Sequence, residues 1–222
     1  MRYRIDPSAD FALEIRRIAA EQMAAVDEIR SVDAAERESA VHAARRHCKK
    51  ARAALRLAAP LFDEDQLKAC TTPIRDAGRA LSHERNAAVL VRALNVLRET
   101  YRDRTESEFV DQIQTELETS RNNAIERGAR ADPAQVARNV DAALEQLGRW
   151  QPGIADPSEI IEGSLTRAYR NCIRAFRLTN PAADEADAWH RSRQAVKDLW
   201  YQTRLLTPGW PPVMRGLATA VV

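Results

Sequence analysis

The chain has 222 residues, of which 45% are hydrophobic, 30% charged and 5% aromatic, a composition typical of a soluble globular protein. Its 34 basic and 32 acidic residues give a net charge of +2, which argues against a general nucleic-acid coat protein, because such proteins carry a larger positive excess. No apolar run is long enough to span a membrane, and the N-terminus lacks the apolar stretch of a signal peptide. We therefore expect a cytoplasmic protein that does not associate with membranes, and core packing is the expected role of its three widely spaced cysteines.

Alanine, arginine and leucine dominate and glycine is scarce at 7 residues, so the sequence predicts an all-α protein. Helix starts are indicated where a capping residue precedes proline, at 6–7, 72–73, 132–133 and 156–157. The helices expected in chain order are 7–30, 33–59, 73–100, 105–128, 133–149, 157–179, 183–206 and a short one at 212–221. The weakest joint lies at Gln151-Pro152-Gly153 and predicts a first helical bundle over 1–150 and a shorter second half over 151–222.

One pattern occurs in two different helices at a constant offset of 148 residues. The four positions His42, Arg45, Lys49 and Arg56 reappear as His190, Arg193, Lys197 and Arg204. Each set falls within an arc of about 60° on an α-helix, and so forms a narrow stripe of one histidine and three cations. Because neighbouring like charges repel, a duplicated stripe of this kind points to an anion that supplies the missing charge.

Two further predicted helices also carry cations along one face. Arginines at 167, 170, 174 and 177 share an arc of about 80°, and Arg75 and Arg79 line another helix with Arg85 beside them. Around the first stripe, 39–61 holds six cations, including Arg52, and no acid. The ordinary alternative is a solvated basic surface whose acidic partners lie on other helices. The functional alternative is a basic groove or channel for a polyanion, in which arginine pairs with phosphate oxygens through two hydrogen bonds.

Three roles compete for His42 and His190. Metal binding needs a carboxylate or second histidine on the same face, and base catalysis needs a nucleophile or carboxylate partner, and the stripes offer neither. Donation of a hydrogen bond to phosphate fits better, with packing at a helix junction as the structural alternative. We therefore expect no metal site, no cofactor and no catalytic residue. Packing in the core or between helices is the default role of Tyr201, and its place beside the second stripe also allows its phenol to donate to an anion.

The segments 41–52 and 79–90 resemble the signature helices of CHAD domains, the conserved histidine α-helical domains, and 190–201 is similar to the family's second histidine helix. The resemblance implies two similar helical bundles with pseudo-twofold symmetry around a basic central cavity. It also implies a module that binds inorganic polyphosphate without catalysis, associated with polyphosphate granules. The binding residues so indicated are His42, Arg45, Lys49, Arg52, Arg56, Arg75, Arg79, Arg85, Arg167, Arg170, Arg174, His190, Arg193, Lys197, Tyr201 and Arg204.

The chain departs from the family pattern in three places. Asn86 replaces an aspartate, Trp200 stands where the first copy has Arg52, and the second half ends soon after its histidine helix, so it is truncated. We expect the two histidine helices to face each other across the cavity. The other functions considered are a nucleic-acid-associated protein that uses the same cations on phosphate backbones, and an accessory module of a phosphohydrolase.

Overall fold

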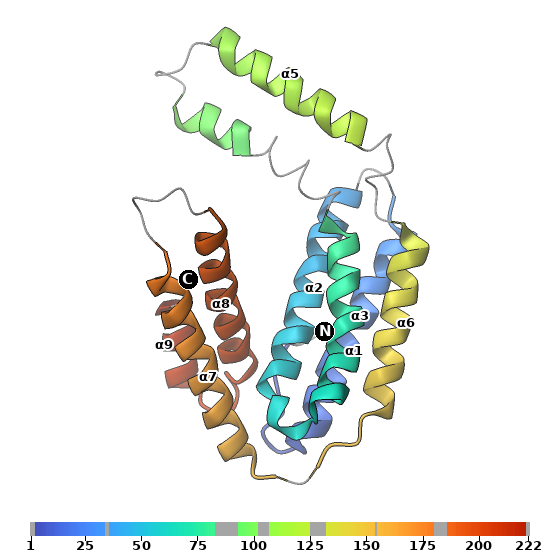
Figure 1. Ribbon diagram of the computed structural model, residues 1–222, viewed down its shortest axis with the longest axis vertical. Coiled ribbons are helices and arrows are strands. Elements are labelled where there is room, and N and C mark those ends of the chain that lie inside the picture. Colours follow the sequence, from blue (N-terminus) through green and yellow to red (C-terminus); the bar gives the residue numbers. More distant parts are fainter. Residues whose placement is uncertain are drawn as a thin grey trace.

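The protein is all-helical throughout the part that the computed structural model describes, which confirms the predicted fold class (Figure 1). The described residues are 3–33, 36–82, 93–101, 107–124, 132–153, 155–179 and 186–220. These ranges contain no β-strand.

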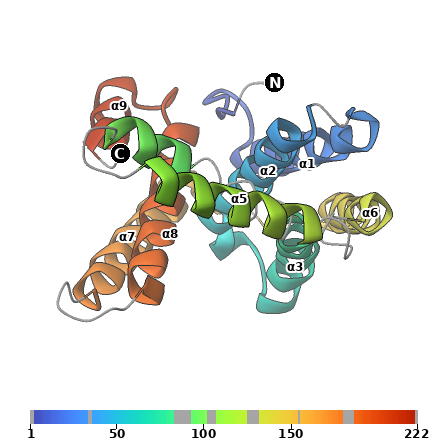
Figure 2. The same ribbon diagram turned by 90° about the horizontal axis from the view of Figure 1, so that it is seen from above.

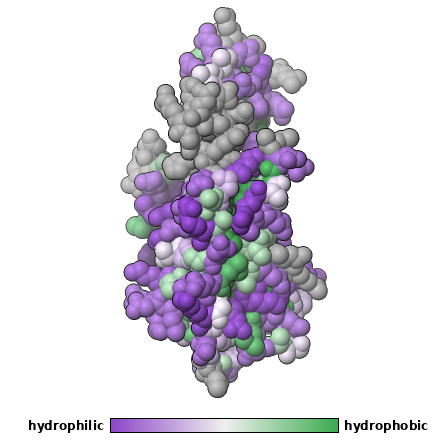
Figure 3. Space-filling model, turned by 90° about the vertical axis from the view of Figure 1, so that its right-hand side faces the viewer, coloured by the Kyte–Doolittle hydropathy of each residue, from purple (hydrophilic) through white to green (hydrophobic). Residues whose placement is uncertain are grey.

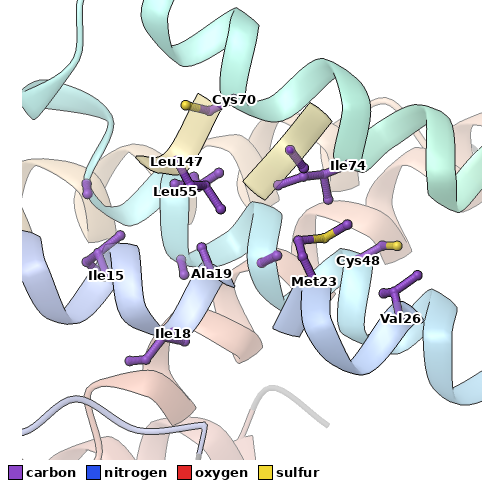
Figure 4. Close-up of a cluster of buried hydrophobic side chains, with 14 of the residues drawn as sticks. Ile15, Ile18, Ala19, Met23, Val26, Cys48, Leu55, Cys70, Ile74 and Leu147 are labelled. Carbon is purple, nitrogen blue, oxygen red and sulfur yellow. The ribbon is translucent and has the colours of Figure 1, made fainter. Parts of the chain in front are cut away.

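Four helices pack in a ring around the main core. They are α1 (Phe11–Asp27), α2 (Arg37–Leu57), α3 (Glu64–Ala80) and α6 (Pro133–Arg149), and each packs against the next, with α6 closing the ring on α1. The short 3-10 helices η1 (Glu28–Ser31) and η2 (Ala59–Leu61) follow α1 and α2. The core side chains drawn in Figure 4, among them Ile18, Leu55, Ile74 and Leu147, are essentially inaccessible to solvent. Burial of these large aliphatic side chains, at about 1.5–3 kcal/mol each, is the main stabilising contribution to the ring.

Three helices form a second group beside the ring. They are α7 (Pro157–Arg177), α8 (Ala186–Leu205) and α9 (Pro211–Ala220), and α8 packs against α7, α9 and α2. The two groups share one continuous core, because Ile160, Leu205 and Met214 belong to the same buried cluster as the ring helices. The chain also ties them together at its start, where the Ile5 amide donates to the Leu205 carbonyl at 3.1 Å. The predicted division at 150/151 falls between α6 and α7 and stays a prediction about independent units.

One helix stands apart from both groups. Within the described part of the chain, α5 (Ser107–Ala124) makes no extensive contact with the other labelled helices, and it crosses above the body in Figures 1 and 2. It is tied to the helical segment 93–100, where Arg98 forms an ion pair with Asp111 at 3.0 Å and donates to Gln114 at 3.1 Å. The face seen in Figure 3 is mostly hydrophilic, as expected for a solvated helical surface.

Two of the four predicted proline starts are confirmed. Asp132 accepts a hydrogen bond from the amide of Ala134 at 2.9 Å, and Asp156 accepts one from the amide of Ser158 at 2.8 Å, so both aspartates cap the helices that begin at the following proline. The start predicted at Asp6-Pro7 is wrong by one turn. Helix α1 begins at Phe11 because Asp10 supplies the N-terminal cap.

The start predicted at Thr72-Pro73 is also wrong, because Pro73 lies inside α3. This helix begins at Glu64, where Asp63 and Gln66 form a reciprocal capping box that satisfies two amides of the first turn. Pro73 removes the donor for the carbonyl of Ala69, and Ala69 is exposed, so water can satisfy that carbonyl. The single helix predicted over 73–100 is also wrong at its end, because α3 ends at Ala80; the described segment 93–100 is helical, and 83–92 lie outside the described residues.

Candidate anion-binding site

Helix α2 carries the first stripe along the border of its buried face. The face predicted from the helical period is buried as expected, including Val41, Cys48 and Leu55. Cys48 packs against α3 at Gly78, where an added Cβ would lie 3.5 Å from the Cys48 Cβ atom. The stripe therefore runs alongside the contact with α3 on one side and faces α8 on the other.

Four arginines of α2 and α3 are electrostatic neighbours, because Arg52 feels the charges of Arg75 and Arg79, and Arg56 feels the charge of Arg52. We call Arg52, Arg56, Arg75 and Arg79 the Arg52 cluster. Arg52 is half-buried, and burial lowers its pKa, with the charges of Arg75 and Arg79 lowering it further. Arg75 is paired with its neighbour Asp76, with 2.9 Å between Nε and Oδ1. No carboxylate within the described residues forms an ion pair with Arg52 or Arg79. Burial and the neighbouring positive charges thus both disfavour the charged form of the Arg52 guanidinium, and a bound anion would stabilise that charged form.

Arg56 has an acidic partner that the sequence reading missed. Its guanidinium donates to the carboxylate of Asp198 on α8, and this ion pair links the two stripe helices. Burial and the charge of Arg52 both lower the pKa of Arg56, and Asp198 is the acidic partner of its guanidinium. At this position the ordinary alternative for the basic stripes therefore applies, because the acidic partner of the cation comes from another helix. The stripe spacing gave no sign of the pair, because Asp198 lies on another helix beside Lys197.

Arg45 holds the C-terminal end of α3. Its Nη1 atom donates to the carbonyl oxygen of Gly78 at 2.6 Å and to the hydroxyl of Ser82. A cation at this end of a helix is favourable, because the last carbonyls lack helical donors and carry partial negative charge. Arg45 therefore has a structural role in addition to any contact with an anion.

A second group of cations surrounds an aromatic cluster between α2 and α8. Lys197 Nζ lies 4.6 Å and Arg204 Cζ lies 4.7 Å from the centroid of the Trp200 ring, which are cation–π distances. Lys50 and Arg46 of α2 lie near the same cations. Burial is the largest cause that lowers the pKa of Lys50, and the charges of Arg204 and Arg46 lower it further. We call these residues, together with Tyr3 and Tyr201, the Trp200 cluster.

The predicted ligand Tyr201 lies inside this cluster and is buried. Burial raises the pKa of its phenol, and the charges of Arg46 and Arg204 oppose that effect. Tyr3 packs edge-on against it with ring centroids 6.2 Å apart, and the Tyr3 hydroxyl donates to the carbonyl of Lys50 at 3.1 Å. The structure thus gives Tyr201 the environment of a packed aromatic residue, which is the default that the sequence indicates for it, and its role as a donor to an anion stays a prediction.

The remaining predicted residues that the structure describes are exposed. His42 and Lys49 lie on the solvent side of α2, and His190 on α8 has its Nε2 atom 2.5 Å from Nε2 of Gln194. Arg193 is exposed on α8. Three further arginines are exposed on α7: Arg167, Arg170 and Arg174. Arg85 lies outside the described residues.

The predicted site residues that the structure describes therefore fall into two clusters, a set of exposed residues, and Arg45 at the end of α3. The Arg56–Asp198 pair connects α2 and α8 between the clusters. Sequence reasoning missed Tyr3, Arg46, Lys50 and Asp198, of which the two α2 cations were visible as members of the acid-free run 39–61. The facing of His42 and His190 across one cavity stays a prediction. The described residues contain no group of three acids, histidines or cysteines that could hold a metal, and no described helix is long and apolar enough to cross a membrane.

Comparison with protein families matches residues 17–221 to the family described as CHAD domain. Comparison with curated proteins finds no match, and comparison with solved structures finds none either.

Proposed function

The chain belongs to the CHAD domain family, and we propose that it is a binding module for inorganic polyphosphate that performs no catalysis. The observation that carries the proposal is the Arg52 cluster, in which a half-buried guanidinium is repelled by neighbouring arginines. Bound phosphates would neutralise these charges, and the fork geometry of arginine suits bidentate pairing with phosphate oxygens. The exposed cations of α7 and α8 would extend the contact along a linear polyanion.

The internal repeat supports a pseudo-twofold site. Adding 148 to the bounds of α1, α2 and α3 gives 159–175, 185–205 and 212–228, and α7, α8 and α9 span 157–177, 186–205 and 211–220. In both triplets the middle helix packs against the other two. We propose that a local twofold axis passes between α2 and α8 and relates the Arg52 and Trp200 clusters.

Contacts between α2 and α8 agree with this axis. Arg56 contacts Asp198, and Lys50 is an electrostatic neighbour of Arg204. The position equivalent to Arg56 in the second copy is 56 + 148 = 204, and the position equivalent to Asp198 in the first copy is 198 − 148 = 50. The repeat therefore maps the Arg56–Asp198 contact onto the Arg204–Lys50 contact. A twofold relation between the helices produces this exchange, whereas an unrelated packing would produce it only by coincidence.

A titration with polyphosphate tests the proposal. The variant Arg52→Glu with Arg79→Glu reverses two members of the Arg52 cluster that make no described ion pair, and we expect it to weaken binding at least tenfold. The control Lys68→Glu with Arg138→Glu makes the same change in net charge on exposed surfaces of α3 and α6, and it should retain most of the affinity. Reversal of Arg45 is less informative, because it also releases the end of α3.

Full affinity in the Arg52/Arg79 variant would reject this cluster as the site. The same titration with single- and double-stranded DNA, at one salt concentration, separates polyphosphate from nucleic acid as the ligand. Tighter binding to nucleic acid would replace the proposal with that alternative.

A further inference from the structure

Trp200 stands between two cations of the second stripe on α8. Lys197 and Arg204 lie three residues before it and four residues after it, so the three side chains share one face of the helix. Lys197 Nζ is 4.6 Å and Arg204 Cζ is 4.7 Å from the centroid of the Trp200 ring. At these distances the negative face of the ring attracts both charges. The ring therefore favours one place for each cation.

The ring has no acidic competitor for these two cations in the part of the chain that the structure describes. Neither Lys197 nor Arg204 forms an ion pair there, and Asp198, the residue after Lys197, pairs with Arg56 instead. Arg204 is exposed and Lys197 is half-buried, so a ligand can reach both. A long side chain that is not held samples many rotamers, and fixing it in a complex costs affinity. Contact with the ring reduces that cost, because it limits the rotamers before the ligand arrives.

Packing fixes the Trp200 ring in turn. Trp200 is half-buried, and its ring centroid lies 5.0 Å from that of Tyr201 with an angle of 60° between the planes. Tyr201 is buried and meets Tyr3 edge-on, and the Tyr3 hydroxyl donates to the carbonyl of Lys50 on α2. The three rings therefore form a packed row that reaches α2. A ring held in this way does not need to be ordered when a ligand binds.

The first copy of the stripe shows what a cation at this place does. At the offset of 148, Trp200 is equivalent to Arg52, and Arg204 is equivalent to Arg56. The charge of Arg52 lowers the pKa of Arg56, so these two side chains repel each other. In the second copy the ring attracts Arg204, and attraction replaces repulsion. The second copy thus carries one cation fewer at these positions and holds Lys197 and Arg204 in place.

We propose that Trp200 is a positioning residue for anion binding, whose ring holds Lys197 and Arg204 in the arrangement that pairs with phosphate groups. The inference rests on the proposed function of the chain as a polyphosphate-binding module. The ring acts without touching the ligand, because it lowers the cost of ordering the two cations when a polyanion binds. Removal of the ring should therefore weaken binding although no charge is removed.

Polyphosphate titrations at one salt concentration, arranged as a double-mutant cycle, test this role. Trp200→Leu removes the ring and should weaken binding about fivefold or more, because ordering one flexible side chain costs roughly two- to twelvefold in affinity. The variant Lys197→Met with Arg204→Met removes the two charges and keeps apolar side chains in their place. In that background Trp200→Leu should change the affinity by less than about twofold, since the groups through which the ring acts are absent. A merely structural role of the ring would weaken binding equally in both backgrounds.

Two more variants serve as rescue and control. Trp200→Phe keeps an aromatic face and should recover part of the affinity that is lost in Trp200→Leu. Trp210→Leu removes a tryptophan that exposes 60% of its surface and makes no described cation–π contact, and it should bind as wild type does. Urea unfolding verifies that each variant is folded at the temperature of the titration.

Wild-type affinity in Trp200→Leu, or an equal loss in both backgrounds, would overturn the proposal. A loss of affinity for single-stranded DNA alone would also overturn it, because the ring would then act by stacking on bases. A wild-type chain that binds no polyphosphate would reject the proposed function together with this inference. Loss of binding in Arg52→Glu with Arg79→Glu, while Trp200→Leu binds as wild type does, would reject this inference alone.

Discussion

The Arg56–Asp198 contact leads to a prediction that separates stability from binding. In Asp198→Asn the shape of the side chain is retained and its charge is lost, so a half-buried guanidinium loses its only described acidic partner. The free protein should become less stable. Binding of polyphosphate should become tighter, because Arg56 is then available to a phosphate.

The size of the effect follows from the exposure of the pair. The Arg56 and Asp198 side chains expose 39% and 31% of their surface, which places the pair between exposed and buried ion pairs. Exposed pairs contribute about 0.2–1 kcal/mol, and breaking a buried pair costs about 3–5 kcal/mol. We expect a loss of about 1–2 kcal/mol in the free energy of unfolding. For a chain of 222 residues this lowers Tm by about 2–8 °C.

A double-mutant cycle provides the assay. Urea unfolding of wild type, Asp198→Asn, Arg56→Met and the double variant gives the coupling energy between the two side chains. We expect about 1 kcal/mol of favourable coupling, and the double variant should be more stable than the sum of the single losses predicts. Strict additivity would show that the two residues do not interact. A polyphosphate affinity that falls in Asp198→Asn would refute the reasoning that this carboxylate competes with the ligand.

Three further predictions concern the ring of helices. Burial, and then nearby cations, lower the pKa of His47 in the folded state. The contribution of His47 to stability is therefore present above about pH 6.5, the pKa of the unfolded state, and is lost as the pH falls through the folded-state pKa. In urea unfolding, the stability of His47→Gln should depend less on pH below about pH 6.5 than that of wild type. Gly78→Ala should raise the free energy of unfolding by about 0.5–1 kcal/mol, because the added Cβ meets Cys48 at an ordinary 3.5 Å, and a loss of stability would show that α3 must move. Ile74→Ala should lower it by about 2–5 kcal/mol in the same assay, and a cost below about 1 kcal/mol would mean that the core refills the cavity.

Local patterns predicted the helices well where one signal acted alone. The aspartate–proline pairs before α6 and α7 gave the right starts, because the capping side chain and the fixed proline torsion favour the same turn. At Pro73 the same signal failed, since the capping box at Asp63 starts a helix that continues through the proline. A residue pair read in isolation does not show a stronger cap ten residues earlier.

The site was predictable along each helix and unpredictable between helices. The periodicity of α2 placed the stripe beside its buried face, as the burial of Val41 and Cys48 shows. Which side chains meet across helices depends on where two helices cross, and that information is not local in sequence. For this reason the pairing of Arg56 with Asp198 emerged only from the structure.

The two copies of the stripe differ in how their positive charge is balanced. At the positions that the offset relates, the first copy has Arg52 and Lys50, and the second has Trp200 and Asp198. The acid of the second copy, Asp198, therefore pairs with Arg56 of the first copy. The ring of Trp200 makes cation–π contacts with Lys197 and Arg204 of its own copy. In the first copy the corresponding cations remain, so Arg52 is repelled by Arg75 and Arg79, and Lys50 is repelled by Arg204. The α2 side of a pseudo-twofold site would then keep the larger uncompensated positive charge, and a polyanion would gain most of its electrostatic binding energy there.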